Sequence, residues 1–394
     1  MNQNLWILII NHIDTLINYY LTKSDTPECG FDLIEDILKY SEKSNSYYHI
    51  FKFFIPLIQT VIGTEEDLAE FHESYPNQIF NGQGFESILD IGRIVCYYIA
   101  KDPKSFIDLK DNNGVGYIVY TTKLIENIIQ VSESKGDYGE IKFCLGIIMT
   151  LFDYYKGQMD KLMNDLIEYV SHKIKNGNIK NKFLIQFLLN VISICFIYDP
   201  IKCLNALQNK NITKEIFIFW FNNLDKLGSK INIKYNLIAI CSIIKIDINK
   251  QDKLIIDNMR QLIESIFSLT KKLNDKIEKQ LEEEIEEDYD DNFSEKDEAK
   301  INEQVKNIVS GEPNDAKDNF EDVDISIENE YDEDDEPINE FDKINTIEFV
   351  KNILNDVGQN REMNNIIVES LGDKFKILND IFNKEEERKL LKKK

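Results

Sequence analysis

Residues 181–200 of this 394-residue chain read NKFLIQFLLNVISICFIYDP, and this stretch decides the fold class. Its apolar side chains recur at the i, i+4 and i+8 positions that form one buried face of an α-helix. They are Phe183, Leu184, Phe187, Leu188, Val191, Ile192 and Cys195. Asp199-Pro200 then ends this helix and starts another, because proline fits a first helical turn and aspartate can cap it. Asp102-Pro103 repeats the arrangement earlier in the chain.

The same helical spacing covers most of the chain before residue 282. Thr64 stands before Glu65, Glu66 and Asp67, where a capping hydroxyl and acids of a first turn are favoured. Sixteen glycines and seven prolines are few for a β-rich protein, which must turn often. We expect helices over 3–21, 30–43, 47–62, 85–101, 116–131, 138–155, 159–175, 181–198, 201–208, 214–227, 231–246 and 252–281.

Paired helices with short connections and a repeat of ~40 residues indicate an all-α helical-repeat solenoid of the HEAT type. An irregular globular helical bundle is the alternative that the spacing leaves open. Apolar stripes return in residues 344–354 and 366–382, so the chain is expected to end in folded helices. We therefore divide it into HEAT-like repeats (1–281), an acidic disordered loop (282–340) and closing helices (341–394), which pair with the helix at 252–281.

The acidic residues are concentrated in one part of the chain. Between Glu278 and Asp342 there are 28 Asp and Glu and 5 Lys, whereas the rest holds 42 acidic and 41 basic residues. Like charges at this density repel, and few apolar side chains are available for collapse. We therefore expect residues 282–340, called the acidic segment below, to be an extended loop. Its ends can lie close together, since closing a longer loop costs only logarithmically more free energy.

Four landmarks in the chain carry a resemblance to a known family. Their order and spacing resemble late repeats of the importin-beta superfamily, most of all its importin seven and eight branch, over about residues 140–390. Residues 1–140 resemble it only loosely. The landmarks are YYKGQMD (154–160), FIYDP (196–200), IFWFNNLD with KYNLIAIC (218–225 and 234–241) and DEDDEPINEF (332–341).

This resemblance implies a nuclear transport receptor that shuttles between nucleus and cytoplasm. It implies a right-handed HEAT superhelix with cargo on its concave face and phenylalanine-glycine nucleoporins in interhelical grooves. It also implies control by the GTPase Ran, whose binding surface lies chiefly in the family's N-terminal repeats. Because this chain is expected to begin inside the array, Ran binding is expected only if those repeats are present. The function implied is the C-terminal, cargo-binding part of a receptor for protein import.

The acidic segment is the feature that we interpret as functional, through electrostatic capture of a basic cargo such as a ribosomal protein or histone. A HEAT-type scaffold or acidic histone chaperone without a transport role is the alternative, and a solvated linker is the bland interpretation. Calcium binding is conceivable, but the fixed spacing of a calcium loop is absent. The candidate cargo-binding residues are Glu282, Glu283, Glu284, Glu286, Glu287, Asp288, Asp290, Asp291, Asp332, Glu333, Asp334, Asp335 and Glu336.

Aromatic and basic residues give two further candidates. A groove for nucleoporin phenylalanines could be lined by Phe217, Phe219, Trp220 and Phe221, although helical spacing predicts that at least two of them pack in the core. The adjacent tyrosine pairs, such as Tyr97-Tyr98 and Tyr154-Tyr155, are expected at repeat interfaces with hydroxyls reaching water. The basic ending at 388–394 is interpreted as a helix end that favours the negative C-terminal dipole, with a localisation signal as the alternative.

The sequence gives no sign of an enzyme. His12, His49, His72 and His172 stand far apart, the glycines at 82–84 and 114–116 lack a dinucleotide motif, and no nucleophile pairs locally with a base. The six cysteines show no metal-ligand spacing and are expected to be buried thiols of a reducing compartment. We expect no cofactor, no metal and no membrane insertion. We also expect no direct nucleic-acid contact, because no basic stripe accompanies the aromatic residues.

Overall fold

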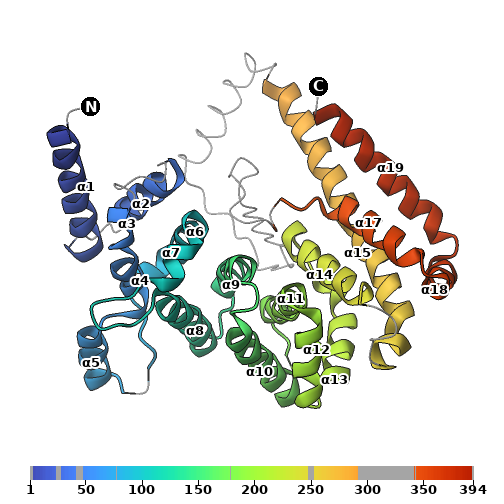
Figure 1. Ribbon diagram of the computed structural model, residues 1–394, viewed down its shortest axis with the longest axis horizontal. Coiled ribbons are helices and arrows are strands. Elements are labelled where there is room, and N and C mark those ends of the chain that lie inside the picture. Colours follow the sequence, from blue (N-terminus) through green and yellow to red (C-terminus); the bar gives the residue numbers. More distant parts are fainter. Residues whose placement is uncertain are drawn as a thin grey trace, which may run out of the picture.

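The computed structural model describes residues 3–23, 28–40, 48–76, 78–177, 179–246, 253–291, 341 and 343–392. Over these ranges the regular structure is helical, apart from one antiparallel bridge between Lys110 and Gly116. The helices stack into an arch with the two chain ends at its opposite tips (Figure 1). The predicted all-α solenoid of HEAT type is confirmed. No helix in the described ranges combines the length and hydrophobicity that a membrane span requires.

The concave side of the arch is a row of helices, each packed against the next one along the chain. We call it the inner row. It consists of α2 (Glu28–Tyr40), α6 (Ile88–Lys101), α9 (Phe143–Tyr154), α11 (Lys182–Tyr198), α14 (Lys230–Ile244) and α17 (Thr346–Gly358).

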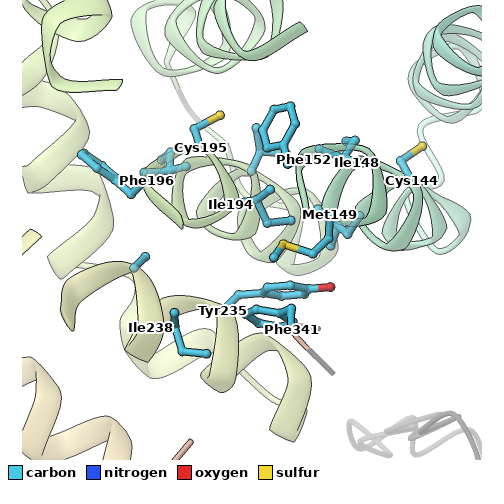
Figure 2. Packing of buried hydrophobic residues seen from close by; sticks show 14 of the residues in the cluster. Cys144, Ile148, Met149, Phe152, Ile194, Cys195, Phe196, Tyr235, Ile238 and Phe341 are labelled. Atoms are coloured by element: carbon cyan, nitrogen blue, oxygen red, sulfur yellow. The ribbon is translucent and has the colours of Figure 1, made fainter. Parts of the chain in front are cut away.

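A second row of helices covers the convex side (Figure 1). This outer row consists of α1 (Gln3–Lys23), α4 (Phe54–Ile62), α8 (Tyr117–Lys135), α10 (Asp160–Asn176), α12 (Pro200–Asn209), α13 (Thr213–Phe221), α15 (Lys253–Asp291) and α18 (Arg361–Leu371). The remaining short helices are α3 (Tyr48–Phe51), α5 (Glu65–Ser74) and α7 (Pro103–Asp108), of which α5 lies at the outer edge of the arch (Figure 1), and α19 (Lys374–Lys392) ends the described chain. The hydrophobic core is the seam between the two rows, with residues such as Phe152, Ile194 and Phe196 buried in it (Figure 2).

The predicted helix starts are confirmed. Asp199 caps α12 by accepting hydrogen bonds from the backbone N–H of Ile201 and Lys202, and Asp102 caps α7 in the same way. Thr64 and Asp67 form a reciprocal capping box at the start of α5. These caps satisfy backbone donors that the first helical turn would otherwise leave unpaired.

Several predicted helix ends differ from the structure; the helix expected at 214–227, for example, ends at Phe221. Three differences have a clear physical cause. The helix expected at 47–62 is interrupted after Phe51, because Pro56 in the first turn of α4 has no N–H and its ring excludes a helical carbonyl at Lys52. Helix α5 was predicted only through its capped start at Thr64 and was absent from the expected helix ranges, because it buries no residue that would give an apolar stripe. Helix α15 continues to Asp291, ten residues beyond its predicted end, through a run rich in glutamate, which is a good helix former.

Two of the paired tyrosines keep their hydroxyls inside the repeat interfaces. Tyr98 is fully buried and donates a hydrogen bond to the backbone carbonyl of Ile50 (2.8 Å). Tyr155 donates to the carbonyl of Pro103 (2.9 Å) in the neighbouring repeat. For these two the packing prediction was right and the expectation that the hydroxyl reaches water was wrong, whereas Tyr19 is 52% exposed. Backbone carbonyls at the ends of neighbouring helices provide the acceptors.

Candidate functional site

A groove opens on the outer row between α13 and α15, which we call the α13/α15 groove. Its volume is about 260 Å³, and three apolar and four polar residues line it. Ile218 is 50% exposed, Phe221 is half-buried, and Phe221 packs edge-on against the buried Phe217 with ring centroids 5.7 Å apart. The lining residues are Lys214, Phe217, Ile218, Phe221, Asn222, Asn258 and Gln261.

The aromatic residues predicted for a groove divide between core and surface. Phe217 and Trp220 are buried, as the helical spacing of α13 predicted for at least two of the four. Phe219 and Phe221 are half-buried, and only Phe221 of these two lines the groove. The sequence analysis missed Ile218, although it follows Phe217 by one residue and so lies about 100° around the helix from that buried position.

A buried hydrogen-bond network holds α13 in place. Trp220 stacks on Phe196 of α11 (5.5 Å between ring centroids, 13° between planes), and its indole N–H donates to the Asn236 side-chain oxygen (2.6 Å). The Asn236 amide N–H₂ donates to the Asn190 side-chain oxygen (3.0 Å), and the Asn190 amide donates to Asn232 (2.7 Å). The network therefore joins α11, α13 and α14 and fixes the wall of the groove.

The structure describes only part of the predicted cargo-binding set. Glu282 is exposed on α15, and the helical backbone continues through Asp291. The side chains of Glu283, Glu284, Glu286, Glu287, Asp288, Asp290 and Asp291 lie outside the described structure. So do residues 292–340 entirely, including the cluster at 332–336 and the predicted loop conformation.

Helix α19 contacts the helices on both sides of the acidic segment. We call the C-terminal part of α15 and the start of α17 the two stems. Glu278 of α15 accepts from Lys384 (2.6 Å) and pairs with Arg388 (3.5 Å), and Arg388 also donates to Asn274 (3.0 Å). On the other stem, Asn345 at the start of α17 donates to Glu385 of α19 (2.7 Å). The predicted pairing of the helix at 252–281 with the closing helices is confirmed.

The basic residues at the end of α19 are used inside the molecule where they are described. Arg388 is 17% exposed on its side chain, and Lys389 pairs with Glu348 of α17. Leu390 and Leu391 are exposed beside them. These contacts favour the interpretation as a basic helix end, because a localisation signal needs its first basic residues accessible.

Over about half of its length the chain is similar to a known protein. The chain is 23% identical over 218 residues to a probable importin-7 homolog from Dictyostelium discoideum, a match that covers 53% of this chain. The resemblance to the importin-beta superfamily is confirmed. The matched part is 18% of the length of that importin-7 homolog, so the chain corresponds to less than a fifth of it. No family model matches the chain. No solved structure matches it either.

Three buried cysteines in the described residues are poorly suited to covalent chemistry. Burial raises the pKa of the thiols of Cys144, Cys195 and Cys241 well above the usual range, so these cysteines stay protonated and unreactive. In the described ranges no three His, Cys, Asp or Glu side chains meet in a group that could hold a metal ion.

A Cβ at Gly82 would lie 2.0 Å from the Thr60 carbonyl oxygen, so this glycine permits close packing of two backbone segments.

Replacing Glu278 by glutamine is expected to loosen α19 by less than about 1 kcal/mol, because the Glu278 side chain is more than one-third exposed. The hydrogen bond from Lys384 lowers the pKa of Glu278 below its usual value. A lowered pKa gives stability that is complete above the usual glutamate pKa and is lost as the pH falls through the folded-state value. The protection factors of the α19 amides, which correct for the intrinsic pH dependence of exchange, should therefore fall below about pH 4.5 in the wild type, and less steeply in the Glu278→Gln variant.

Glu369→Gln serves as the control, because Glu369 pairs with Arg260 at an exposed position between α18 and α15, away from the stems. It should leave α19 exchange unchanged. Equal acceleration of α19 exchange in both variants would show that Glu278 is not the group that holds this helix.

Proposed function

We propose that the chain is the C-terminal, cargo-binding part of a nuclear transport receptor for protein import. The observation that carries the proposal is the α13/α15 groove. It is a groove between the outer-row helices α13 and α15, lined in part by Phe217, Ile218 and Phe221, in a HEAT-type solenoid that resembles an importin. Such a groove suits the phenylalanine rings of phenylalanine-glycine nucleoporins, because a ring gains free energy from burying its apolar surface there.

The cargo of this proposal is a basic protein of the ribosomal-protein or histone kind, contacted by the thirteen candidate carboxylates, which are half of the 26 in the acidic segment. Attraction between exposed charges extends only about 8 Å at physiological salt, so affinity must come from many weak contacts. The chain outside this segment is almost neutral, which leaves the segment as the main source of the negative field.

Localisation and regulation follow from the same proposal. A receptor of this kind shuttles between cytoplasm and nucleus through the pore. Ran binding is proposed only for a chain that also carries the N-terminal repeats of the family. The importin-like relative points to transport rather than enzymatic activity, and the proposed mechanism is binding without covalent chemistry.

The test of cargo binding changes the thirteen carboxylates to their amides, Glu→Gln and Asp→Asn, which keeps side-chain size and chain length. A fluorescent lysine-rich peptide of 20 residues is titrated at 50 mM and 200 mM salt and followed by anisotropy. We expect the wild type to bind several-fold more tightly at low salt. The amide variant keeps the other thirteen carboxylates of the segment, so it should bind more weakly and with a shallower salt dependence.

The matched control changes exposed acids elsewhere, namely Glu66, Glu70 and Glu73 of α5. It should bind the peptide as the wild type does. Unchanged affinity of the amide variant at low salt would contradict the role of the acidic segment. Peptide binding together with a failure to bind phenylalanine-glycine repeats would instead favour the histone-chaperone or scaffold alternative.

A further inference from the structure

Phe341, the first described residue after the acidic segment, is held on the inner row. Its ring stacks face to face on Tyr235 of α14, with centroids 4.9 Å apart and planes 13° apart, and it is 2% exposed. Figure 2 shows the two rings one over the other. The Nζ of Lys234 lies 4.8 Å from the centroid of the Phe341 ring. The chain that leads from here into α17 runs along the concave side of the arch (Figure 1).

The contact has the chemistry of a ring-binding site. A flat tyrosine face offers dispersion contact over the whole ring, and an ammonium group near the ring is attracted by its negative face. The backbone after Phe341 is held as well, since its carbonyl accepts from the N–H of Ile344 (3.1 Å) and Asn345 caps α17. Phe341 is therefore fixed both through its side chain and through the helix that follows.

We propose that the Tyr235–Lys234 face of α14 is an aromatic-binding site whose resident ligand is Phe341, and that Phe341 is the positioning residue that fixes the end of the acidic segment to the inner row. The occupant is this chain's own residue, seated in the structure. The consequence is a limit on where the cluster at 332–336 can be.

Chain geometry sets that limit. A fully extended chain covers at most about 3.6 Å per residue. Glu336 is five residues from Phe341, so it lies within about 18 Å of this anchor, and Asp332 lies within about 32 Å. Without the Phe341 contact, the next held residue is Ile344, which packs against the core, and the three added residues extend each limit by about 11 Å. The contact therefore keeps these carboxylates within reach of the concave side of α14.

The inference deepens the proposed function, on which its meaning for cargo rests, but the anchoring can be measured without cargo. Spin labels are attached to cysteines at Glu336→Cys and Lys245→Cys, the second at the exposed end of α14. Cys29 is changed to serine, because it is exposed whereas the other five cysteines are buried. Double electron–electron resonance then gives the distance distribution between the labels.

We expect a confined distribution in the labelled parent protein, and one that broadens about twofold and shifts to longer distances in Phe341→Ala. Phe341→Trp keeps a flat ring and should restore the parent distribution. An unchanged distribution in Phe341→Ala would overturn the proposal.

A second variant covers the case in which Phe341→Ala does not fold. Twelve glycine and serine residues are inserted between Glu340 and Phe341, so that Phe341 keeps its seat while the tether lengthens by up to about 40 Å. The distribution should broaden here as well. No broadening on insertion would show that Phe341 is not the anchor.

The effect on cargo is read from contact positions rather than from affinity. Lengthening the tether lowers the effective concentration of the carboxylates only about twofold, so the affinity for the lysine-rich peptide should fall by about that factor. The same peptide with a benzophenone group should crosslink mainly to α11, α14 and α17 in the wild type and also to α15, α18 and α19 in Phe341→Ala. Peptide affinity that stays unchanged when the thirteen carboxylates become amides would contradict the proposed function. Identical crosslinks in the wild type and in Phe341→Ala would contradict the positioning role.

Discussion

Replacing Trp220 by alanine is expected to lower the free energy of unfolding by about 4 kcal/mol, the largest effect of any single change proposed for this chain. Trp220 is fully buried between α13 and α11, where it stacks on Phe196. Alanine leaves a cavity that close-packed neighbours fill only in part. It also removes the indole N–H from Asn236, so that a buried amide oxygen loses its donor.

The measurement for Trp220 is urea unfolding followed by circular dichroism, with hydrogen exchange to locate the loss. Because repeat arrays can unfold in parts, exchange should rise first in α11, α13 and α14, which share the network. Trp220→Phe keeps an aromatic ring but not the donor, and we expect it to cost about 1–2 kcal/mol. A Trp220→Ala protein within 1 kcal/mol of the wild type would show that the network does not hold α13.

Replacing Ile218 by aspartate is expected to weaken binding of a phenylalanine-glycine repeat peptide at least tenfold. A phenylalanine ring that enters the α13/α15 groove would have to strip water from the new carboxylate, and the apolar ring offers that carboxylate no hydrogen bond in return. The same change should affect folding little, because half of the Ile218 side chain is already exposed.

Ile201→Asp is the matched control for Ile218. Ile201 is 52% exposed on α12, also on the outer row, and does not line the groove. Affinity of a labelled peptide with several Phe-Gly units is measured for both variants and the wild type by anisotropy. Equal affinities for the Ile201→Asp and Ile218→Asp proteins would show that the peptide binds elsewhere, and would remove the main support for a transport role.

The helices could be predicted where local physics alone decides them. The apolar face of α11 and the aspartate caps before Pro103 and Pro200 are properties of a few neighbouring residues, and the structure confirms them. Helix α5 could not be found by its stripe, because it buries no side chain in the described structure. The extent of α15 was underestimated, since charge repulsion was weighed above the helix propensity of glutamate.

The sites depended on tertiary contacts that no sequence period contains. The groove needs α13 and α15 side by side, although about thirty residues separate Phe221 from the start of α15. The seat of Phe341 needs a ring on α14 that precedes it by more than a hundred residues. The composition of the acidic segment was evident in the sequence, but the stems that position it became visible only through α19.

The order of contacts along the inner row allows the curvature of the arch to change in small steps. From α2 to α17 each inner helix packs on the next, so a small tilt at each joint adds to the tilt at the one before it. The tips of the arch can then approach or separate while every individual contact is kept. The curvature of the arch can therefore change at a small cost in free energy, and a bound partner can determine which curvature the molecule adopts.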